Sequence, residues 1–389
     1  MKRTLSAILI ALLLFPVLAC AAATAEIDAQ VDSYFRRSRT TGGALVVFKD
    51  GEIAYQRYYG VQDKTVYEPV TENTYFRVAA VSEMVTAIGL MQLRDQGLVD
   101  LDQDISAYFG YKIANFYYPD TPLTLRQLMS HTSTVSEGGG YSIGNPVYEM
   151  LSAAIRRRGN YTDHEPGSVY QYSDFGAGLV GAIMEAVSGV SVDHYMAEAV
   201  FRPLGIDAAY DPIGLQNPKA MADLYQSDGT RYRSAWGLLR DGYPDFADPE
   251  AHYGSAVGKL WIRAGDLAKL GIALCGNGTA DGAALLTLES VREMREDQAA
   301  LGKSVTGDSP YGLLLQRVQS LVGGHTFYGY QGRVAGTLCN LYFEPETQFG
   351  FVMLTNGCNN GLDNYIGTLA RRQFVYAYET FAGIAPPEE

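Results

Sequence analysis

Residues 75–84 of the 389-residue chain read YFRVAAVSEM, and this stretch decides the fold. Its first half reads as the end of a short strand, which we expect over Thr74–Val78. Apolar residues then recur at helical spacing, which predicts a helix over Ala80–Gln96. The stretch is therefore a strand that leads directly into a helix. Ala80 lies at the junction, and Glu83 follows one helical turn later.

Further strands are predicted near both ends of the chain. Asp50-Gly51 is a hairpin signal between the runs Gly43–Phe48 and Glu52–Tyr59. Towards the C-terminus, strands are predicted over Thr326–Tyr330, Gly336–Phe343 and Phe349–Thr355. Helices accompany these strands at Ile27–Arg39, Ala264–Cys275 and Asp363–Phe381.

The middle of the chain is helical in pattern. Helices are predicted over Leu123–His131, Tyr148–Arg157, Gly176–Ser188 and Val192–Phe201, with turn-rich segments such as Glu137–Pro146 between them. This organisation predicts a single α+β domain over residues 26–389. Its antiparallel sheet would come from residues 26–97 and 254–389, with a helical part over 98–253. A ligand site is expected in a cleft between the two parts.

Composition and charge exclude several classes of protein. Hydrophobic residues make up 47% of the chain and charged residues 19%, which is ordinary for a globular protein. The net charge of −13 argues against binding to nucleic acid or to an anionic membrane surface. No motif for a cofactor or a metal ion occurs, so we expect neither.

The N-terminus reads as an export signal over residues 1–25. Lys2 and Arg3 precede an apolar run, and Ala23-Thr24-Ala25 is a cleavage site of the small-residue type. In the alternative interpretation, Cys20 is a lipoprotein anchor, and only then would the protein meet a membrane. Either way we expect a secreted, periplasmic or cell-surface protein.

Three cysteines remain after such processing: Cys275, Cys339 and Cys358. Cys339 and Cys358 flank one predicted hairpin, so a disulfide between them is one interpretation. Three separate, small apolar fillers are the other.

Six segments resemble motifs of the serine β-lactamase-related family, which includes class C β-lactamases, D-alanyl-D-alanine carboxypeptidases and esterases. Residues 75–84 resemble its nucleophile segment, Phe-Arg-x-Ala-Ser-x-x-Lys. The other five are Gly97–Asp102, Thr124–Ser133, Pro166-Gly167 with Tyr172-Ser173-Asp174, Arg202–Ile206 and Tyr330-Gln331-Gly332. The six segments follow each other in the family's order, and the resemblance extends over the chain from about Gly43 to Gly357. The resemblance implies the α+β fold of serine β-lactamases and penicillin-binding proteins.

The resemblance also implies a site. In the family a serine attacks a carbonyl, a lysine three residues later takes the proton, and a tyrosine shares the transfer. Here Ala80 and Glu83 stand at the serine and lysine positions, whereas Tyr172 is retained. The backbone N–H groups of Ala80 and Arg333 would be the oxyanion donors. Since alanine cannot be acylated, the resemblance predicts that the acylation chemistry is lost.

Other serines are weak substitutes for the nucleophile. Ser82 should point some 200° away from Ala80 around the helix, at about 100° per residue. Ser130 and Ser173 lie in segments where the family also has serine without using it as the nucleophile. A serine hydrolase with a different nucleophile nevertheless remains an alternative.

The altered residues suggest an acidic, aromatic pocket. We expect Glu83 and Asp174 to face the cleft, near Tyr172, Tyr330 and Gly332. Such a pocket could recognise a cationic group. Alternatively Arg333 pairs with the two carboxylates, or the carboxylates act as acid and base. A metal site is disfavoured, because His131 belongs to a structural segment and His325 precedes the strand leading into the site.

The sequence therefore predicts an exported pseudoenzyme of this family that binds a peptide, a cell-wall fragment or another protein. The alternatives are an active hydrolase of β-lactamase, carboxypeptidase or esterase type, and a protein that merely folds. The 28 tyrosines fit carbohydrate or peptide binding as well as packing between loops. Some of them cluster outside the predicted core positions: Tyr108, Tyr111, Tyr117, Tyr118, Tyr141, Tyr161 and Tyr170.

Overall fold

The computed structural model describes residues 24–139, 145–155, 157–241, 254–298, 303–304, 311–359, 361–363 and 366–383. Residues 1–23 of the predicted export signal, which include Cys20, lie outside the described residues. Thr24 and Ala25 are described. Tyr141 and part of the expected turn-rich segment Glu137–Pro146 also lie outside them.

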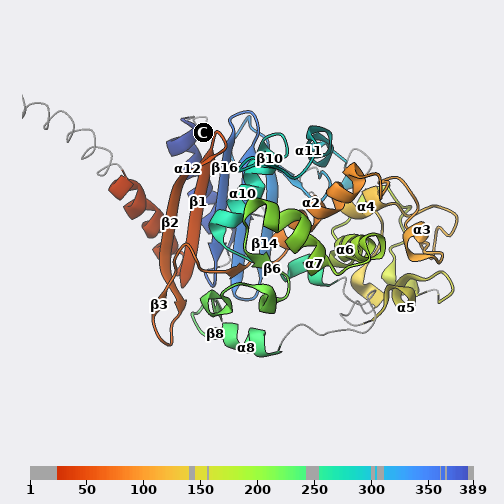
Figure 1. Ribbon diagram of the computed structural model, residues 1–389, viewed down its shortest axis with the longest axis horizontal. Helices are drawn as coiled ribbons and strands as arrows, with labels where there is room; N and C mark the ends of the chain where they lie inside the picture. The colour runs from red at the N-terminus through yellow and green to blue at the C-terminus, as the bar shows by residue number, and fades with distance from the viewer. Residues whose placement is uncertain are drawn as a thin grey trace, which may run out of the picture.

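Strands from both ends of the chain form one seven-stranded antiparallel sheet, as the sequence predicts (Figure 1). Its order is β13-β14-β15-β16-β1-β2-β3. These strands are β1 (Gly42–Lys49), β2 (Glu52–Asp63), β3 (Glu68–Pro69), β13 (Gln316–Val318), β14 (Phe327–Val334), β15 (Thr337–Glu344) and β16 (Phe349–Thr355). Because β1 pairs with β16, the first and last long strands lie side by side.

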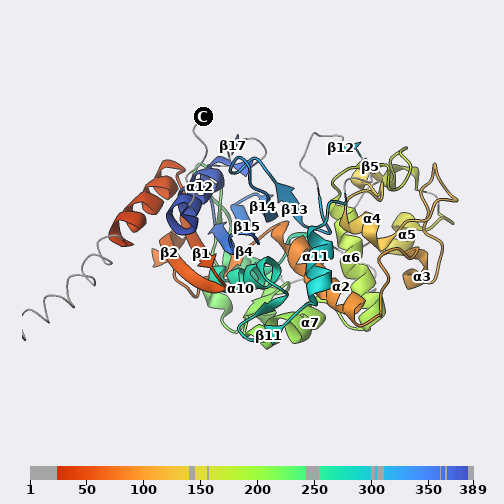
Figure 2. The same ribbon diagram turned by 90° about the horizontal axis from the view of Figure 1, so that it is seen from above.

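Helices cover both faces of this sheet, and the alternation of side chains along β1 explains why. Ala44, Val46 and Phe48 belong to a core cluster shared with α2 (Val81–Asp95) and α10 (Ala264–Cys275). Leu45 and Val47 point to the opposite face. There they pack with the helix over 24–37 and with α12 (Thr368–Ala382), as Figure 2 shows from above.

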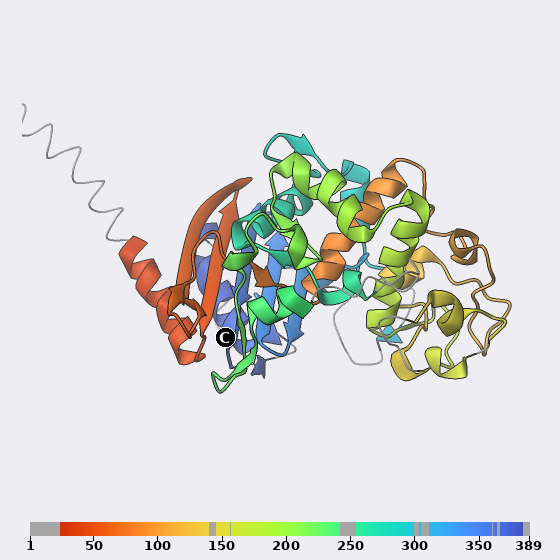
Figure 3. The ribbon, with the colours of Figure 1, turned by 60° about the horizontal axis from the view of Figure 1, so that its bottom comes forward.

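The middle of the chain forms the helical part, which lies beside the sheet with α2 between the two (Figure 3). Its α-helices are α3 (Ser106–Phe109), α4 (Leu125–Met129), α5 (Val147–Leu151), α6 (Asp174–Ser188), α7 (Val192–Met196) and α8 (Ala235–Asp241). The return to the sheet carries α9 (Ser255–Gly258) and α11 (Leu288–Arg295). Short strands include β4 (Phe76–Arg77), β5 (Val169–Tyr170), β6 (Ala208–Ala209), β7 (Leu224–Tyr225), β8 (Arg231–Arg233) and β9 (Trp261–Ile262).

Several predicted helices are shorter in the structure. The segment predicted over Tyr148–Arg157 ends at Leu151, because Ser152 turns extended and bridges to Ile113. The helix expected over Val192–Phe201 changes at Ala197 into a π-helical turn. The closing helix begins at Thr368 rather than Asp363.

The cysteine alternatives are resolved in favour of packing. Cys275, Cys339 and Cys358 are free and buried, so the suggested Cys339–Cys358 disulfide does not form. The thiol of Cys339 instead donates to the carbonyl oxygen of Arg77. The three residues are the small apolar fillers of the alternative interpretation.

Among the described residues, no single helix is long and apolar enough to cross a membrane. Two consecutive helical segments, Asp174–Ser188 and Val192–Leu204, are long and apolar enough only when they are taken together, and the chain bends by 79° between them.

Candidate functional site

Three segments that are distant in the sequence converge on the start of α2. They are the β4–α2 junction, the loop that leads into α6, and strand β14. Gly332 of β14 lies so close to the junction that a Cβ there would be 2.1 Å from the carbonyl oxygen of Val78 and 3.1 Å from the nitrogen of Ala80. Only glycine allows this approach.

The backbone at the junction is strained at Ala79, directly before the first N–H groups of α2. Ala79 has a φ of 48°, which is the left-handed region that alanine rarely adopts. Ala80 follows as the N-cap of α2. Among the described residues, none accepts a hydrogen bond from the Ala80 N–H. The Ala80 N–H is therefore not used in backbone hydrogen bonds among the described residues, and its role as an oxyanion donor stays a prediction.

Glu83 lies in the first turn of α2 and is 0% exposed. Its Oε1 is 2.6 Å from the hydroxyl of Tyr172, and its Oε2 accepts a hydrogen bond of 2.7 Å from Tyr330. Tyr330 is also 0% exposed, whereas Tyr172 is 38% exposed. The expectation that Glu83 faces the cleft is therefore wrong, because the two tyrosines enclose its carboxyl group. Burial raises the pKa of Glu83 well above its ordinary value.

His131 contacts the hydroxyl group of Tyr330. Its Nε2 is 3.3 Å from the Tyr330 hydroxyl, and its Nδ1 accepts a hydrogen bond of 3.3 Å from the Ser173 N–H. Complete burial lowers the pKa of His131 to about 3, so the ring is neutral at physiological pH. A neutral ring that accepts at Nδ1 carries its proton on Nε2 and donates it to Tyr330.

Asp174 is the outer carboxylate of the site. It is half-buried, and its Oδ1 is 2.8 Å from the Tyr172 hydroxyl. Burial raises the pKa of Asp174, with a further contribution from the carboxylate of Glu137. Glu137 accepts hydrogen bonds from the Ser173 hydroxyl and the Phe175 N–H at the start of α6. No pattern in the sequence singles out Glu137, which lies in a short 3-10 helix over Glu137–Gly139.

Arg333 does not neutralise these carboxylates. Its side chain is exposed, its backbone pairs with Leu338 of β15, and no ion pair joins it to Glu83 or Asp174. The alternative in which Arg333 pairs with both acids is therefore not formed.

The other serines considered as nucleophiles are all buried. The Ser82 hydroxyl donates to the Ala79 carbonyl oxygen and accepts from the Leu260 N–H. Ser130 donates to the carbonyl oxygen of Arg126, and Ser173 caps α6. Each hydroxyl is used in local structure, which explains these serines without catalysis.

The tyrosines outside the predicted core divide between packing and surface positions. Tyr161 and Tyr170 are core residues, and Tyr111 packs edge-on against Tyr148 at 5.0 Å. Tyr117 lies beneath Arg158, and Tyr108 donates to the Asp100 carbonyl oxygen. Within the described residues, no group of three or more His, Cys, Asp or Glu could hold a metal ion.

Comparison with known proteins matches this architecture. A family model described as Beta-lactamase matches residues 26–373. Esterase EstB of Burkholderia gladioli is 28% identical over 207 residues, which are 48% of this chain and 51% of that protein. Protein flp of Staphylococcus aureus strain MRSA252 is 22% identical over 184 residues, or 46% of this chain and 36% of that protein. The matched region is thus about a third to a half of each relative.

Solved structures agree in fold. The octameric penicillin-binding protein homologue from Pyrococcus abyssi superposes with a TM-score of 0.73 at 20% identity, covering 94% of this chain and 78% of that one. At this identity the likeness concerns the fold alone.

Proposed function

Since the chain belongs to the beta-lactamase family, we propose that it is a member that does not acylate its ligand but binds it. The binding surface would be the one around Ala80, Tyr172 and Asp174. The observation that carries the proposal is the enclosure of Glu83 by Tyr172 and Tyr330. Because both carboxyl oxygens of Glu83 are held in hydrogen bonds by the two tyrosines, neither would be presented to a ligand carbonyl as a nucleophile.

The remaining groups suit recognition. The Ala80 N–H can donate a hydrogen bond to a carbonyl oxygen of a ligand, and the half-buried Asp174 can accept a hydrogen bond from a ligand. A peptide or a cell-wall fragment offers both a carbonyl group and a cationic amine. With the export signal expected over residues 1–25, the protein would act outside the cytoplasm, at the cell envelope.

Loss of the nucleophile has a large effect on rate. Removing the nucleophile of a serine hydrolase lowers the rate about a million-fold, and about a thousand-fold acceleration over water can survive. Binding is therefore the activity on which the proposal rests.

The test is the intact mass of the protein after long incubation with a penicillin and, separately, with a fluorophosphonate. We expect no adduct with either probe. The double variant A80S/E83K restores a serine and a lysine at the two positions and should gain an adduct, whereas A80S alone should react much more slowly for want of a base.

A stoichiometric adduct on the wild-type protein would overturn the proposal. It would favour an active hydrolase with another nucleophile, and peptide mapping would then locate the modified side chain. Hydrolysis of an ester without any adduct would instead favour a carboxylate pair.

A further inference from the structure

The contacts of the Tyr172 hydroxyl cannot all be made by its own proton. The oxygen lies 2.6 Å from Glu83 Oε1 and 2.8 Å from Asp174 Oδ1. A phenol has one proton to donate, and an ionised carboxylate has none. Two short contacts between three oxygens therefore require two protons, so that one of the two carboxyl groups must carry one.

The surroundings of Glu83 decide which carboxyl group is protonated. His131 donates from Nε2 to Tyr330, so the Tyr330 proton is directed at Glu83 Oε2. Oε2 is then the acceptor atom of Glu83, and Oε1 is free to carry a proton towards Tyr172. Glu83 is fully buried, whereas Asp174 is partly exposed to water, which stabilises the charged form of Asp174 instead.

We propose that Glu83 is a neutral carboxylic acid that donates to Tyr172, that Tyr172 donates to Asp174, and that Asp174 is the charged acceptor for an ammonium group of the ligand. The chain of donors then runs from the Ser173 N–H through His131, Tyr330, Glu83 and Tyr172 to Asp174. Every donor in it has one acceptor.

The charges around Asp174 support a cationic ligand. Glu137 lies nearby and adds a second negative charge. Tyr311, whose ring meets Tyr330 edge-on at 6.0 Å, completes the ionisable groups around Glu83. Because His131 is neutral and Arg333 forms no ion pair with either acid, the described site holds no cation against these carboxylates. An ammonium group from a ligand would supply this missing positive charge.

Infrared spectroscopy at neutral pH tests the position of the proton. A protonated carboxyl group has a C=O stretch that is separate from those of ionised carboxylates. We expect this band in the wild type and in D174N, and its loss in E83Q, whose amide preserves the size of the side chain. If the band is absent from the wild type, or is lost in D174N and kept in E83Q, the assignment to Glu83 is wrong.

Titration with n-butylammonium, followed by NMR, tests the ligand class, with n-butanol as the neutral probe. D174N should weaken butylammonium binding about ten-fold or more, since a charge-assisted hydrogen bond is lost. E83Q should leave binding within about two-fold of the wild type, because it removes no charge. Equal losses in both variants would show that Glu83 is ionised. Equal binding of butylammonium and butanol to the wild type would overturn the role of Asp174.

This inference rests on the proposed function only for the ligand. An adduct with the penicillin or fluorophosphonate would overturn the binding role and leave the infrared result unaffected. A missing carboxyl band would overturn the proton assignment and leave the absence of acylation unaffected. The circular dichroism spectra of E83Q and D174N would confirm that both variants are folded.

Discussion

At the scale of single residues, an acid at position 83 is acceptable only with particular neighbours. A carboxyl group at 0% exposure needs hydrogen-bond partners for both oxygens, and Tyr172 and Tyr330 supply them. In the related family the position of Tyr330 is expected to hold histidine or lysine. The departures at residues 83 and 330 are therefore physically linked, since the tyrosine hydroxyl satisfies the oxygen that the glutamate introduces.

This link predicts a large effect of Y330F on stability. The variant would leave Glu83 Oε2 without a donor and the Nε2–H of His131 without an acceptor. Each buried group left unpaired costs about 1–3 kcal/mol, so we expect a loss of about 2 kcal/mol or more in the free energy of unfolding. Chemical denaturation measures it.

The matched control is Y328F on the same strand. Tyr328 stacks on Phe343 and its hydroxyl has no hydrogen bond to a described residue. We expect its loss to change the free energy of unfolding by less than about 0.5 kcal/mol. Similar effects of Y330F and Y328F would contradict the importance of the Glu83 contacts.

The buried acid also predicts an unusual pH dependence. Burial raises the pKa of Glu83 in the folded state above its ordinary value, which the unfolded chain retains. Between the two pKa values the folded state binds the extra proton, so stability is greatest below the ordinary pKa and falls as pH rises. The loss is at most about 1.4 kcal/mol per pH unit. From about pH 5.5 to about pH 8, E83Q should gain stability relative to the wild type.

His131 contributes a pH dependence of the free energy of unfolding of the opposite sign. Because His131 is present in both E83Q and the wild type, its contribution cancels when the two proteins are compared. Its folded pKa of about 3 lies below the unfolded one, so its contribution is lost as pH falls. The measurement is chemical denaturation of both proteins at several pH values. A difference between them that does not change with pH would mean that Glu83 titrates normally.

At the scale of elements, the contact of α10 with the sheet depends on a missing side chain. A Cβ at Gly271 would lie 2.8 Å from Cε1 of Phe48 and 3.0 Å from Cδ1 of Leu341. The Phe48 ring cannot retreat, because it also fills the space above Gly350, where a Cβ would be 1.8 Å away. We therefore expect G271A to lower the free energy of unfolding by about 1–3 kcal/mol.

The same helix provides the control for G271A. Gly265 also lies in α10, and the atom nearest to a Cβ there is 4.0 Å away. G265A should be neutral or stabilising by up to about 1 kcal/mol, since alanine is the better helix former. Compared by thermal denaturation, G271A should therefore destabilise the protein and G265A should not. Equal effects of the two substitutions on stability would show that helix propensity, and not contact with Phe48, determines the effect of alanine in α10.

The same elements show how far the sequence predicts the fold. The helix Ala264–Cys275 and the strand Phe349–Thr355 have the predicted bounds, because continuous apolar patterns determine both. The end of α5 was not predictable, because the bridge from Ser152 to Ile113 depends on tertiary contact.

The candidate site was predictable in its membership but not in its geometry. Motif order located Ala80, Glu83, Tyr172 and Tyr330. The burial of Glu83 could not be inferred, since the two hydroxyl groups come from positions 89 and 247 residues away. Glu137, which influences the pKa of Asp174, had no sequence signal at all.

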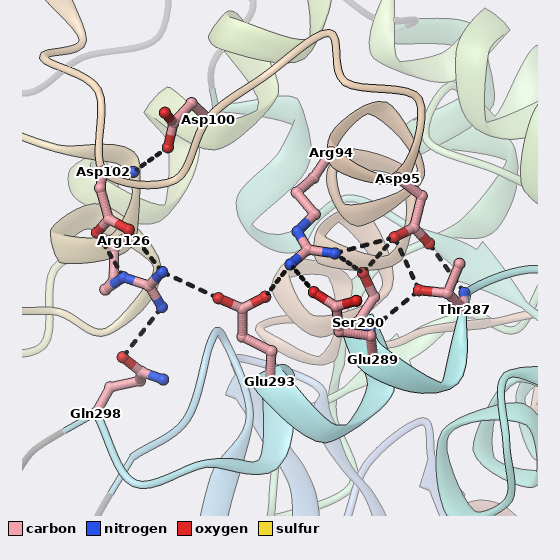
Figure 4. Close-up of polar contacts among 10 residues, drawn as sticks. All are labelled: Arg94, Asp95, Asp100, Asp102, Arg126, Thr287, Glu289, Ser290, Glu293 and Gln298. Atoms are coloured by element: carbon pink, nitrogen blue, oxygen red, sulfur yellow. Dashed lines mark hydrogen bonds and ion pairs between the residues drawn. The ribbon is translucent and has the colours of Figure 1, made fainter.

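At the scale of the whole molecule, the ion pair between Arg126 and Glu293 joins the helical part to the part formed by the two chain ends, within a larger network of charged residues (Figure 4). Glu293 of α11 lies between two arginines: its Oε2 is 2.9 Å from Arg94 at the end of α2, and its Oε1 is 2.9 Å from Arg126 of α4. Arg126 also pairs with Asp102, and Arg94 with Glu289. Glu293 is therefore the shared partner that holds α2 and α4 to α11.

Substitution of Glu293 should weaken the connection between the two parts. The side chains of Glu293, Arg94 and Arg126 are 17%, 24% and 19% exposed, so water screens their interactions only in part. E293Q leaves two arginines facing each other without the negative charge between them, and we expect a loss of about 1–2 kcal/mol in the free energy of unfolding.

The control is E289Q, which removes another carboxylate that pairs with Arg94. Because Glu289 is 76% exposed, the expected loss is below about 0.5 kcal/mol. High salt should abolish the effect of E289Q and leave most of that of E293Q. If both variants lose the same stability and salt removes both effects, the network is a surface feature that does not join the two parts.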